Sequence, residues 1–150
     1  MKNLFSTDHN ARSIDIALLI ARVGVGVLML VHGLPKLATL FSGEPVKFPG
    51  IVINGELSLI LAVFAEVICS LLLIVGLGTR LVVIPLIITM LVAVLHIHAA
   101  DPFAKQELGL HYLLVYVVLL ITGSGKYSLD YLLQSKSKKN YKHVKPNLAI

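Results

Sequence analysis

Two charged side chains, Arg22 and Glu66, lie well inside apolar stretches of the sequence. A charge at the centre of a membrane span costs about 2.5–3.5 kcal/mol on insertion scales, so such a residue faces a bundle interior or a cavity. A rise of 1.5 Å per residue places the two side chains about 12 Å and about 16 Å from the same surface. The sequence therefore predicts an Arg22–Glu66 ion pair. The pair either fixes helix register or takes part in proton or ligand chemistry.

Six further polar side chains gather near the opposite surface, at the ends of three apolar segments: His32, Lys36, His96, His98, Glu107 and His111. Glu107 and His111 are four residues apart, so they share one helix face. His96 lies on the same helical stripe as Ala93, whereas His98 points elsewhere. We therefore expect His96, rather than His98, to face the bundle interior.

Several ligands suit this group of side chains. A quinone-like headgroup would accept a hydrogen bond from histidine while Glu or His relays protons, because the imidazole pKa falls in the working range. Histidine and carboxylate also bind zinc or iron, and two histidines can ligate haem, although the sequence has no compact motif such as HExxH. For His98, the favoured interpretation is a histidine that is merely wetted at the interface.

The leading hypothesis is a quinone site without a metal. Its residues fall into a catalytic group, Glu66, Arg22, His96 and Glu107, and a ligand-binding group, His32, Lys36 and His111. The sequence shows no group that carries electrons itself. Electrons would therefore pass directly between two bound organic molecules, or they would come from a partner redox subunit.

The composition is that of a membrane protein. Hydrophobic residues make up 57% of the 150 residues and charged residues 14%, with a mean hydropathy of +0.87. A soluble domain carries about 25% charged residues, so a cytosolic enzyme or a nucleic-acid module is disfavoured. The net charge of +5 is local, because six lysines lie after residue 125. The single cysteine, Cys69, excludes an intramolecular disulfide.

Four apolar runs have the length of membrane-spanning helices, about 17–25 residues. Lipid offers no partner for open backbone groups, so each run must be helical. The expected fold is all-α, an integral membrane four-helix bundle over residues 14–133, with helices at about 14–34, 57–77, 81–98 and 105–123.

Three segments outside these helices complete the expected organisation. Pro35 is expected to end the first helix and to begin a long loop, 35–56. Residues 1–13 form an N-terminal segment, and the Lys-rich tail 134–150 is expected to be disordered because it has no apolar face.

The distribution of basic residues predicts the orientation in the membrane. With four spans, nine Lys and Arg residues lie on the side of the termini, against three in the opposite loops. The positive-inside rule therefore places the N- and C-termini in the cytoplasm.

The order and spacing of these residues resemble the DoxX family of small bacterial four-helix membrane proteins. The resemblance covers roughly residues 14–133 and rests on Arg22, His32, Gly33, Lys36, Glu66, the turn 76–80, His96, Glu107 and the ending 123–130, which is similar to GxGxxSxD. It implies a multi-pass protein of the bacterial cytoplasmic (inner) membrane. The family takes its name from an association with a thiosulfate:quinone oxidoreductase, and some relatives are linked to oxidative-stress complexes.

Three functions remain open. The first is a quinone-linked oxidoreductase subunit, in contact with the lipid bilayer and a partner redox subunit. The second is a small transporter or permeation subunit, which would need a homo-oligomer because four helices leave little room for a pore. The third is a non-enzymatic assembly partner of a membrane complex, whose tail docks a soluble protein or anionic lipid. No nucleic-acid partner is expected.

Overall fold

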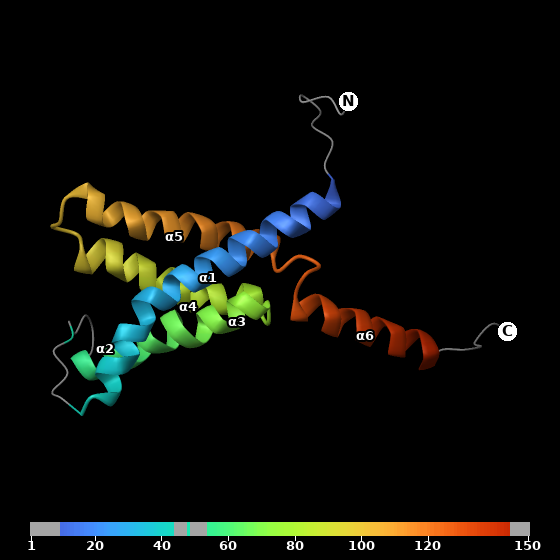
Figure 1. Ribbon diagram of the computed structural model, residues 1–150, viewed down its shortest axis with the longest axis horizontal. Coiled ribbons are helices and arrows are strands. Elements are labelled where there is room, and N and C mark those ends of the chain that lie inside the picture. Colours follow the sequence, from blue (N-terminus) through green and yellow to red (C-terminus); the bar gives the residue numbers. More distant parts are fainter. Residues whose placement is uncertain (1–9, 44–47, 49–53, 145–150) are drawn as a thin grey trace, which may run out of the picture.

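The computed structural model describes residues 10–43, 48 and 54–144, and only the backbone for 138–144. Within these residues every regular element is helical, and four helices are long and apolar enough to cross a membrane (Figure 1). The spans are α1 (Ala11–Phe41), a continuous helix of α2 (Gly55–Val63), η1 (Phe64–Cys69) and α3 (Ser70–Val75), then α4 (Thr79–Val92) with η2 (Ala93–Ile97), and α5 (Phe103–Thr122). The predicted all-α membrane bundle is confirmed.

The first helix runs farther than its sequence suggested. Pro35 was expected to end it, but α1 passes through Pro35 and ends at Phe41. A proline inside a helix removes one backbone donor. The apolar residues beyond it offset this loss, because Leu37 and Leu40 pack on the buried cluster that begins with Leu59 in α2. The prediction that Pro35 stops the helix is therefore wrong. Lys36 lies within α1 instead of in the predicted loop.

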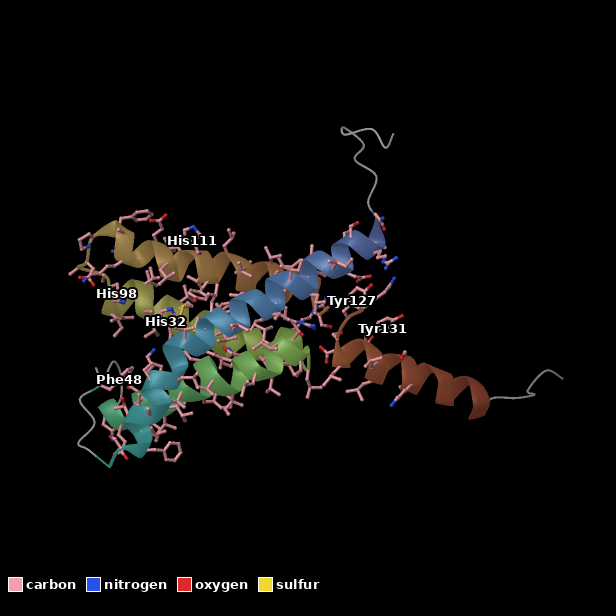
Figure 2. The ribbon with its side chains drawn as sticks, in the orientation of Figure 1. His32, Phe48, His98, His111, Tyr127 and Tyr131 are labelled. Carbon is pink, nitrogen blue, oxygen red and sulfur yellow. The ribbon has the colours of Figure 1, made fainter. Side chains whose placement is uncertain are left out.

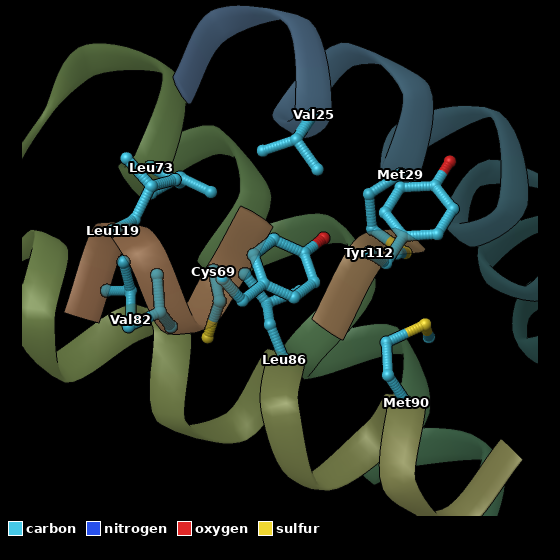
Figure 3. Packing of buried hydrophobic residues seen from close by; sticks show 11 residues of the cluster. Val25, Met29, Cys69, Leu73, Val82, Leu86, Met90, Tyr112 and Leu119 are labelled. Carbon is cyan, nitrogen blue, oxygen red and sulfur yellow. The ribbon is translucent and has the colours of Figure 1, made fainter. Parts of the chain in front are cut away.

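The centre of the bundle is filled by aliphatic, sulfur-containing and aromatic side chains (Figure 3). Met29 from α1, Leu73 from α3, Leu86 from α4 and Leu119 from α5 are fully buried in this cluster. Close packing of this kind holds helices together in a bilayer, where lipid tails are as apolar as the helices themselves. The outward faces carry exposed aliphatic side chains, as expected for contact with lipid.

Two spans contain a π-helical segment. In η2 the backbone N–H of His98 donates to the carbonyl of Ala93, five residues earlier, at 2.9 Å. In η1 the wider turn leaves Ala65, Glu66 and Val67 buried in succession. A π segment changes which residues face the bundle beyond it, and such segments are frequent at functional sites.

Both termini of the described chain lie at one end of the bundle, here called the terminal end; the α4–α5 turn lies at the other, the distal end (Figure 1). At the terminal end, α3 closes in a Schellman motif: Gly76 N–H donates to Leu73 O at 3.1 Å, and Leu77 N–H to Leu72 O at 3.0 Å. Gly76 adopts a φ of 72°, a left-handed conformation that favours glycine.

The tail differs from its expected disorder, since α6 (Leu129–Val144) is helical and projects from the terminal end (Figure 1). Its first turn is fixed to the bundle. Asp130 N–H donates to Gly76 O at 3.0 Å, and Tyr131 N–H donates to Ser128 Oγ at 3.2 Å. Once a first turn is held, propagation adds one hydrogen bond per residue, and the Leu, Gln and Lys residues that follow are good helix formers. Residues 145–150 of the predicted tail lie outside the described residues.

Candidate functional site

The buried carboxylate of Glu66 pairs with Lys36 rather than with Arg22. Lys36 Nζ donates to Glu66 Oε1, and the Glu66 side chain is 2% exposed against 31% for Lys36. A Cβ on Gly33, one turn before Lys36, would lie 3.0 Å from the Glu66 Cβ, so α1 and η1 are in close contact there. The predicted Arg22–Glu66 pair is therefore wrong, because α1 continues through Pro35 and presents Lys36 to this carboxylate.

Arg22 instead closes the terminal end of the bundle. Its guanidinium, 1% exposed, donates to the carbonyls of Ser124 at 3.3 Å and Tyr127 at 2.6 Å. A Cβ added to Gly76 would lie only 1.8 Å from Arg22 Nη1, so the helix turn and the guanidinium share one narrow space. Arg22 thus holds the segment after α5 in place, far along α1 from Glu66.

Asp130 completes this closure by capping α4. Its carboxylate accepts from the backbone N–H of Gly78 at 2.7 Å and of Thr79 at 3.1 Å. A carboxylate at a helix N-terminus satisfies orphan donors and opposes the positive end of the helix dipole. A hollow of about 510 Å³ lies beside it, and within its lining Arg80 donates to Ile121 O at 3.0 Å. The residues of the ending 123–130 therefore have a structural role here.

Two cavities flank the Lys36–Glu66 pair at the distal end. The polar cavity, about 160 Å³, is lined by Met29, His32, Lys36, Glu66, Met90, Ala93, Val94, His98, Lys105, Leu108, Gly109 and Tyr112. The apolar cavity, about 230 Å³, is lined by Lys36, Phe48, Ser58, Leu61, Ala62, Glu66, Ile88, Thr89, Val92, Ala93 and Ile97. Both share the ion pair, so a ligand in either cavity lies against a carboxylate and an ammonium group.

Glu66 has an acceptor that no described residue satisfies. Its Oε1 is bound to Lys36, but its Oε2 is buried and without a hydrogen-bond partner among the described residues. A buried polar group left unpaired costs about 1–3 kcal/mol, and more when it is charged. The site is thus complete only when a donor, from water or a ligand, reaches this oxygen.

His98, not His96, lines the polar cavity. His96 is exposed, and the expectation that it faces the bundle interior is wrong. The reason is the π-helical turn of η2. In this wider turn His98, five positions after Ala93, follows Ala93 on the same face, whereas in a regular α-helix the residue three or four positions later would do so. Figure 2 shows His98 at the same end of the bundle as His32.

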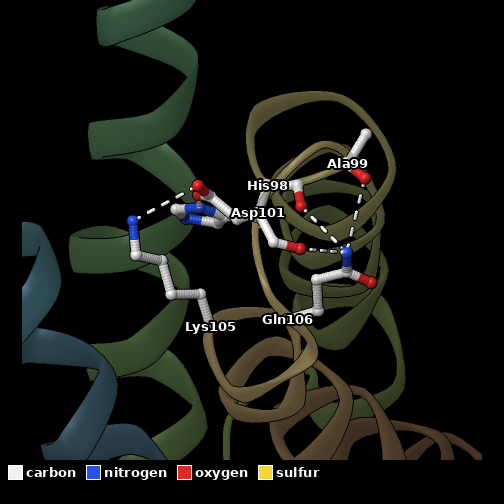
Figure 4. Close-up of polar contacts among 5 residues, drawn as sticks. All are labelled: His98, Ala99, Asp101, Lys105 and Gln106. Carbon is white, nitrogen blue, oxygen red and sulfur yellow. Dashed lines mark hydrogen bonds and ion pairs between the residues drawn. The ribbon is translucent and has the colours of Figure 1, made fainter.

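A hydrogen-bond network in the α4–α5 turn orients His98 (Figure 4). His98 Nδ1 lies 2.7 Å from Asp101 Oδ2, and Lys105 Nζ donates to Asp101 Oδ1 at 3.2 Å. Gln106 Nε2 donates to the carbonyls of His98 at 3.0 Å and Asp101 at 3.1 Å. The side-chain hydrogen bonds from His98, foremost, and from Lys105 hold the pKa of Asp101 below its usual 3.8. An ionised carboxylate only accepts, so His98 donates to Asp101 from Nδ1.

Aromatic rings line the side of the polar cavity formed by α5. The rings of His32 and Tyr112 meet edge to face at 5.9 Å, and Tyr112 stacks on Tyr116 at 6.1 Å. The Tyr116 hydroxyl is buried and, among the described residues, has no partner. The ring contacts extend from the exposed His32 at the cavity wall to the buried Tyr116 in the core.

The other predicted site residues lie apart from this cavity. Glu107 is exposed, and its backbone carbonyl lies 2.8 Å from His111 Nδ1. His111 is exposed on α5 and lines neither of the two cavities that hold the ion pair. The structure thus brings together Glu66, Lys36 and His32 of the predicted set. It does not bring Arg22, His96, Glu107 or His111 into the polar cavity.

Sequence reasoning missed the contributions of Asp101, Lys105 and Gln106. Asp101 and Lys105 have the i, i+4 spacing of an ion pair at a helix start, and Gln106 follows directly. That spacing could have indicated a fixed turn beside the histidines. Among the described residues no three His, Cys, Asp or Glu side chains gather to form a metal site.

A family comparison agrees with this architecture. The model of the DoxX family matches residues 17–99, more than half of the 150 residues. The matched segment holds His32, Lys36, Glu66 and His98 of the polar cavity, whereas Lys105 and Tyr112 lie beyond it. No curated protein and no solved structure gives a significant match. The chain is a multi-pass membrane protein that belongs to the DoxX family.

Proposed function

We propose that this protein binds a quinone headgroup in the polar cavity and serves as a quinone-linked component of a membrane redox system. The observation that carries the proposal is the unsatisfied Oε2 of Glu66, which lies beside Lys36 at the wall of the cavity. The oxidised quinone accepts hydrogen bonds at its ring carbonyls, and the reduced quinol donates them from its hydroxyls. The paired ammonium and carboxylate match both.

The residues of the polar cavity can hold such a ring and move protons. Lys36 would donate to a carbonyl oxygen of the oxidised quinone, and Glu66 Oε2 would accept from a hydroxyl of the reduced quinol. His98, held by Asp101 through Nδ1, lines the same cavity and adds a second basic side chain to it. Tyr112 and His32 provide aromatic surface for stacking. The cavity, about 160 Å³, is smaller than the 300–1,000 Å³ typical of drug-sized ligands, so it fits one headgroup rather than a large substrate.

The proposed setting is the bacterial cytoplasmic membrane, with both termini in the cytoplasm and the polar cavity near the outer surface. The nine basic residues on the side of the termini support this orientation. A partner redox subunit would exchange electrons with the bound quinone, and the described residues would provide the binding site and the proton-accepting groups. A homo-oligomer is compatible with this proposal but is not needed for it.

Permeation of protons or a small solute is a second candidate, because two cavities meet at one ion pair. Both cavities lie in the distal half, however, and the terminal half is filled by Val25, Leu73, Val83 and Leu119. A path across the membrane would have to open this core. Solute or proton flux in proteoliposomes, abolished by Glu66→Gln, would favour permeation over quinone binding.

Mass spectrometry of an organic extract of the detergent-purified protein tests the quinone proposal. We expect a stoichiometric quinone in the wild-type protein and its loss in Glu66→Gln and His98→Ala. The matched controls are Glu107→Gln and His96→Ala, which change the same residue types at exposed positions outside the cavity. The proposal is wrong if the wild-type protein carries no more quinone than an unrelated membrane protein does. Equal loss in the controls would also contradict it.

A further inference from the structure

An apolar groove opens on the outside of the bundle between α1 and α5. This α1/α5 groove, about 470 Å³, is lined chiefly by aliphatic residues such as Ile20, Leu28 and Val31 of α1 and Leu108 and Val115 of α5. Many of these side chains are exposed, so the groove faces the lipid in a membrane. In Figure 1, α1 crosses α5 and diverges from it toward the distal end.

The α1/α5 groove adjoins the polar cavity directly. Three residues, His32, Leu108 and Tyr112, line both spaces. His32 and Tyr112 meet edge to face, so these two rings form the partition between the lipid side and the ion pair. An apolar trough open to lipid therefore ends at a small chamber with an unsatisfied carboxylate oxygen.

The groove has the length and the open side that a hydrocarbon chain needs. Its α1 wall runs from Ile20 to His32, about 18 Å at 1.5 Å per residue. Gly24 lies in this wall, and a Cβ there would have nothing within 4 Å. Burial of methylene groups against aliphatic side chains adds packing contacts without requiring polar partners.

We infer that the α1/α5 groove holds the hydrocarbon tail of the ligand whose headgroup occupies the polar cavity. The ligand class is thus a tailed, lipid-soluble quinone, which reaches the ion pair sideways from the bilayer past His32 and Tyr112. This inference rests on the proposed function. It adds an access route, a second subsite and a requirement for a tail, none of which the headgroup site demands.

The test compares two probes on one protein: a decyl-substituted benzoquinone and the same ring bearing a methyl group instead. Gly24→Leu adds bulk to the groove without contacting the polar cavity. Ala38→Leu is the matched control, because Ala38 is exposed on the same helix and lines neither the groove nor either cavity. Binding is measured by titration of the purified protein in detergent micelles, and its thermal midpoint reports on folding.

We expect the wild-type protein to bind the decyl probe more tightly than the methyl probe. Gly24→Leu should weaken decyl binding by about tenfold or more, since several methylene groups lose their contacts. It should leave methyl binding unchanged, and Ala38→Leu should affect neither probe. Equal affinity of both probes, or unchanged decyl binding in Gly24→Leu, would overturn the tail subsite while leaving the headgroup site intact.

Two other outcomes separate the tail subsite from its alternatives. If neither probe binds the wild-type protein, the proposed function fails and this inference fails with it. If the groove is instead an interface with a second copy of the chain, Leu28→Cys should form a disulfide-linked dimer under oxidation, and Gly24→Leu should dissociate a dimer. That result would overturn the assignment of the groove to a tail.

Discussion

Glu66 and Arg22 are both almost fully buried, but their charges are satisfied in different ways. Each side chain has one buried polar atom without a described partner, Oε2 of Glu66 and Nε of Arg22. Glu66 lines two cavities and pairs with a cation, whereas Arg22 lines none of the cavities described above and donates to two backbone carbonyls. The loop carbonyls that bind Arg22 belong to the protein and stay in place. The unpaired oxygen of Glu66 lies next to a cavity, so a water molecule or a ligand can bind to it and leave again. At the scale of single residues, this difference assigns Glu66 to ligand chemistry and Arg22 to structure.

Loss of Lys36 and loss of Glu66 should lower the stability of the protein by different amounts. Lys36→Met leaves a buried carboxylate unpaired and should lower stability by about 3 kcal/mol. Glu66→Gln leaves an ammonium that is 31% exposed and can extend toward the membrane surface, so its cost should be about 1 kcal/mol. Thermal unfolding in detergent checks this order. The double variant should recover most of the loss, and equal effects of the two single variants would contradict the assigned burial.

Arg22→Lys should destabilise the bundle without altering ligand binding by the folded fraction. A lysine cannot reproduce the planar fork that reaches the Ser124 and Tyr127 carbonyls together. Loss of one charged hydrogen bond costs about 1.5–3 kcal/mol. Gly76→Ala should have a similar effect, because its Cβ would displace the guanidinium and its φ of 72° disfavours alanine. Loss of quinone from fully folded Arg22→Lys protein would restore a catalytic role to Arg22.

At the scale of elements, η2 decides which histidine enters the cavity. Deletion of Leu95, an exposed residue of η2, should convert the π turn to an α turn. Ala93 and His98 would then be four residues apart, so the histidine should stay on the cavity face and ligand binding should persist. Deletion of Ile88 from the regular part of α4 is the control, since it rotates the following residues by about 100° and should abolish binding. Titration with a short-chain quinone distinguishes the two; equal loss in both deletions would refute this role of η2.

The α4–α5 turn should loosen only under strong acid. The pKa of Asp101 is lowered by its hydrogen bonds to His98 and Lys105, so protons bind more tightly to the unfolded turn than to the folded one. The stabilisation is complete above the usual pKa of 3.8 and disappears as the pH falls through the lower pKa of the folded turn. Hydrogen exchange of residues 98–106, corrected for intrinsic rates, should therefore accelerate below about pH 4. Asp101→Asn should remove this pH dependence, and a transition above pH 5 would contradict it.

At the scale of the whole molecule, the bundle depends on residues up to Asp130 but not on the rest of the tail. Truncation after Leu133 should change the thermal midpoint little, because the described contacts that fix α6 to the bundle end with its first turn. Asp130→Ala should lower stability by about 0.5–2 kcal/mol through loss of the α4 cap. Unfolding of the truncated and substituted proteins in the same detergent tests both statements. A strongly destabilised truncation would show that the distal part of α6 is needed.

The sequence predicts the spans well because membrane insertion is governed by local hydrophobicity. The predicted segments 57–77, 81–98 and 105–123 differ from the observed helices by only one or two residues at each end. The interior geometry was less predictable, since which residues face one another depends on helix phase. Passage of α1 through Pro35 changed the partner of Glu66, and η2 exchanged His96 for His98. Neither event has an unambiguous local pattern in a single sequence.

The bonds of Arg22 also bear on how the protein is made. Tyr127, whose carbonyl accepts from this guanidinium, follows it by 105 positions in the chain. During translation the first helix therefore reaches the membrane with a cation whose permanent acceptors have not yet been synthesised. The nascent helix must remain near water, lipid headgroups or the insertion machinery until the fourth span and the loop after it have emerged. The final packing of the first helix into the bundle is consequently one of the last events of biogenesis.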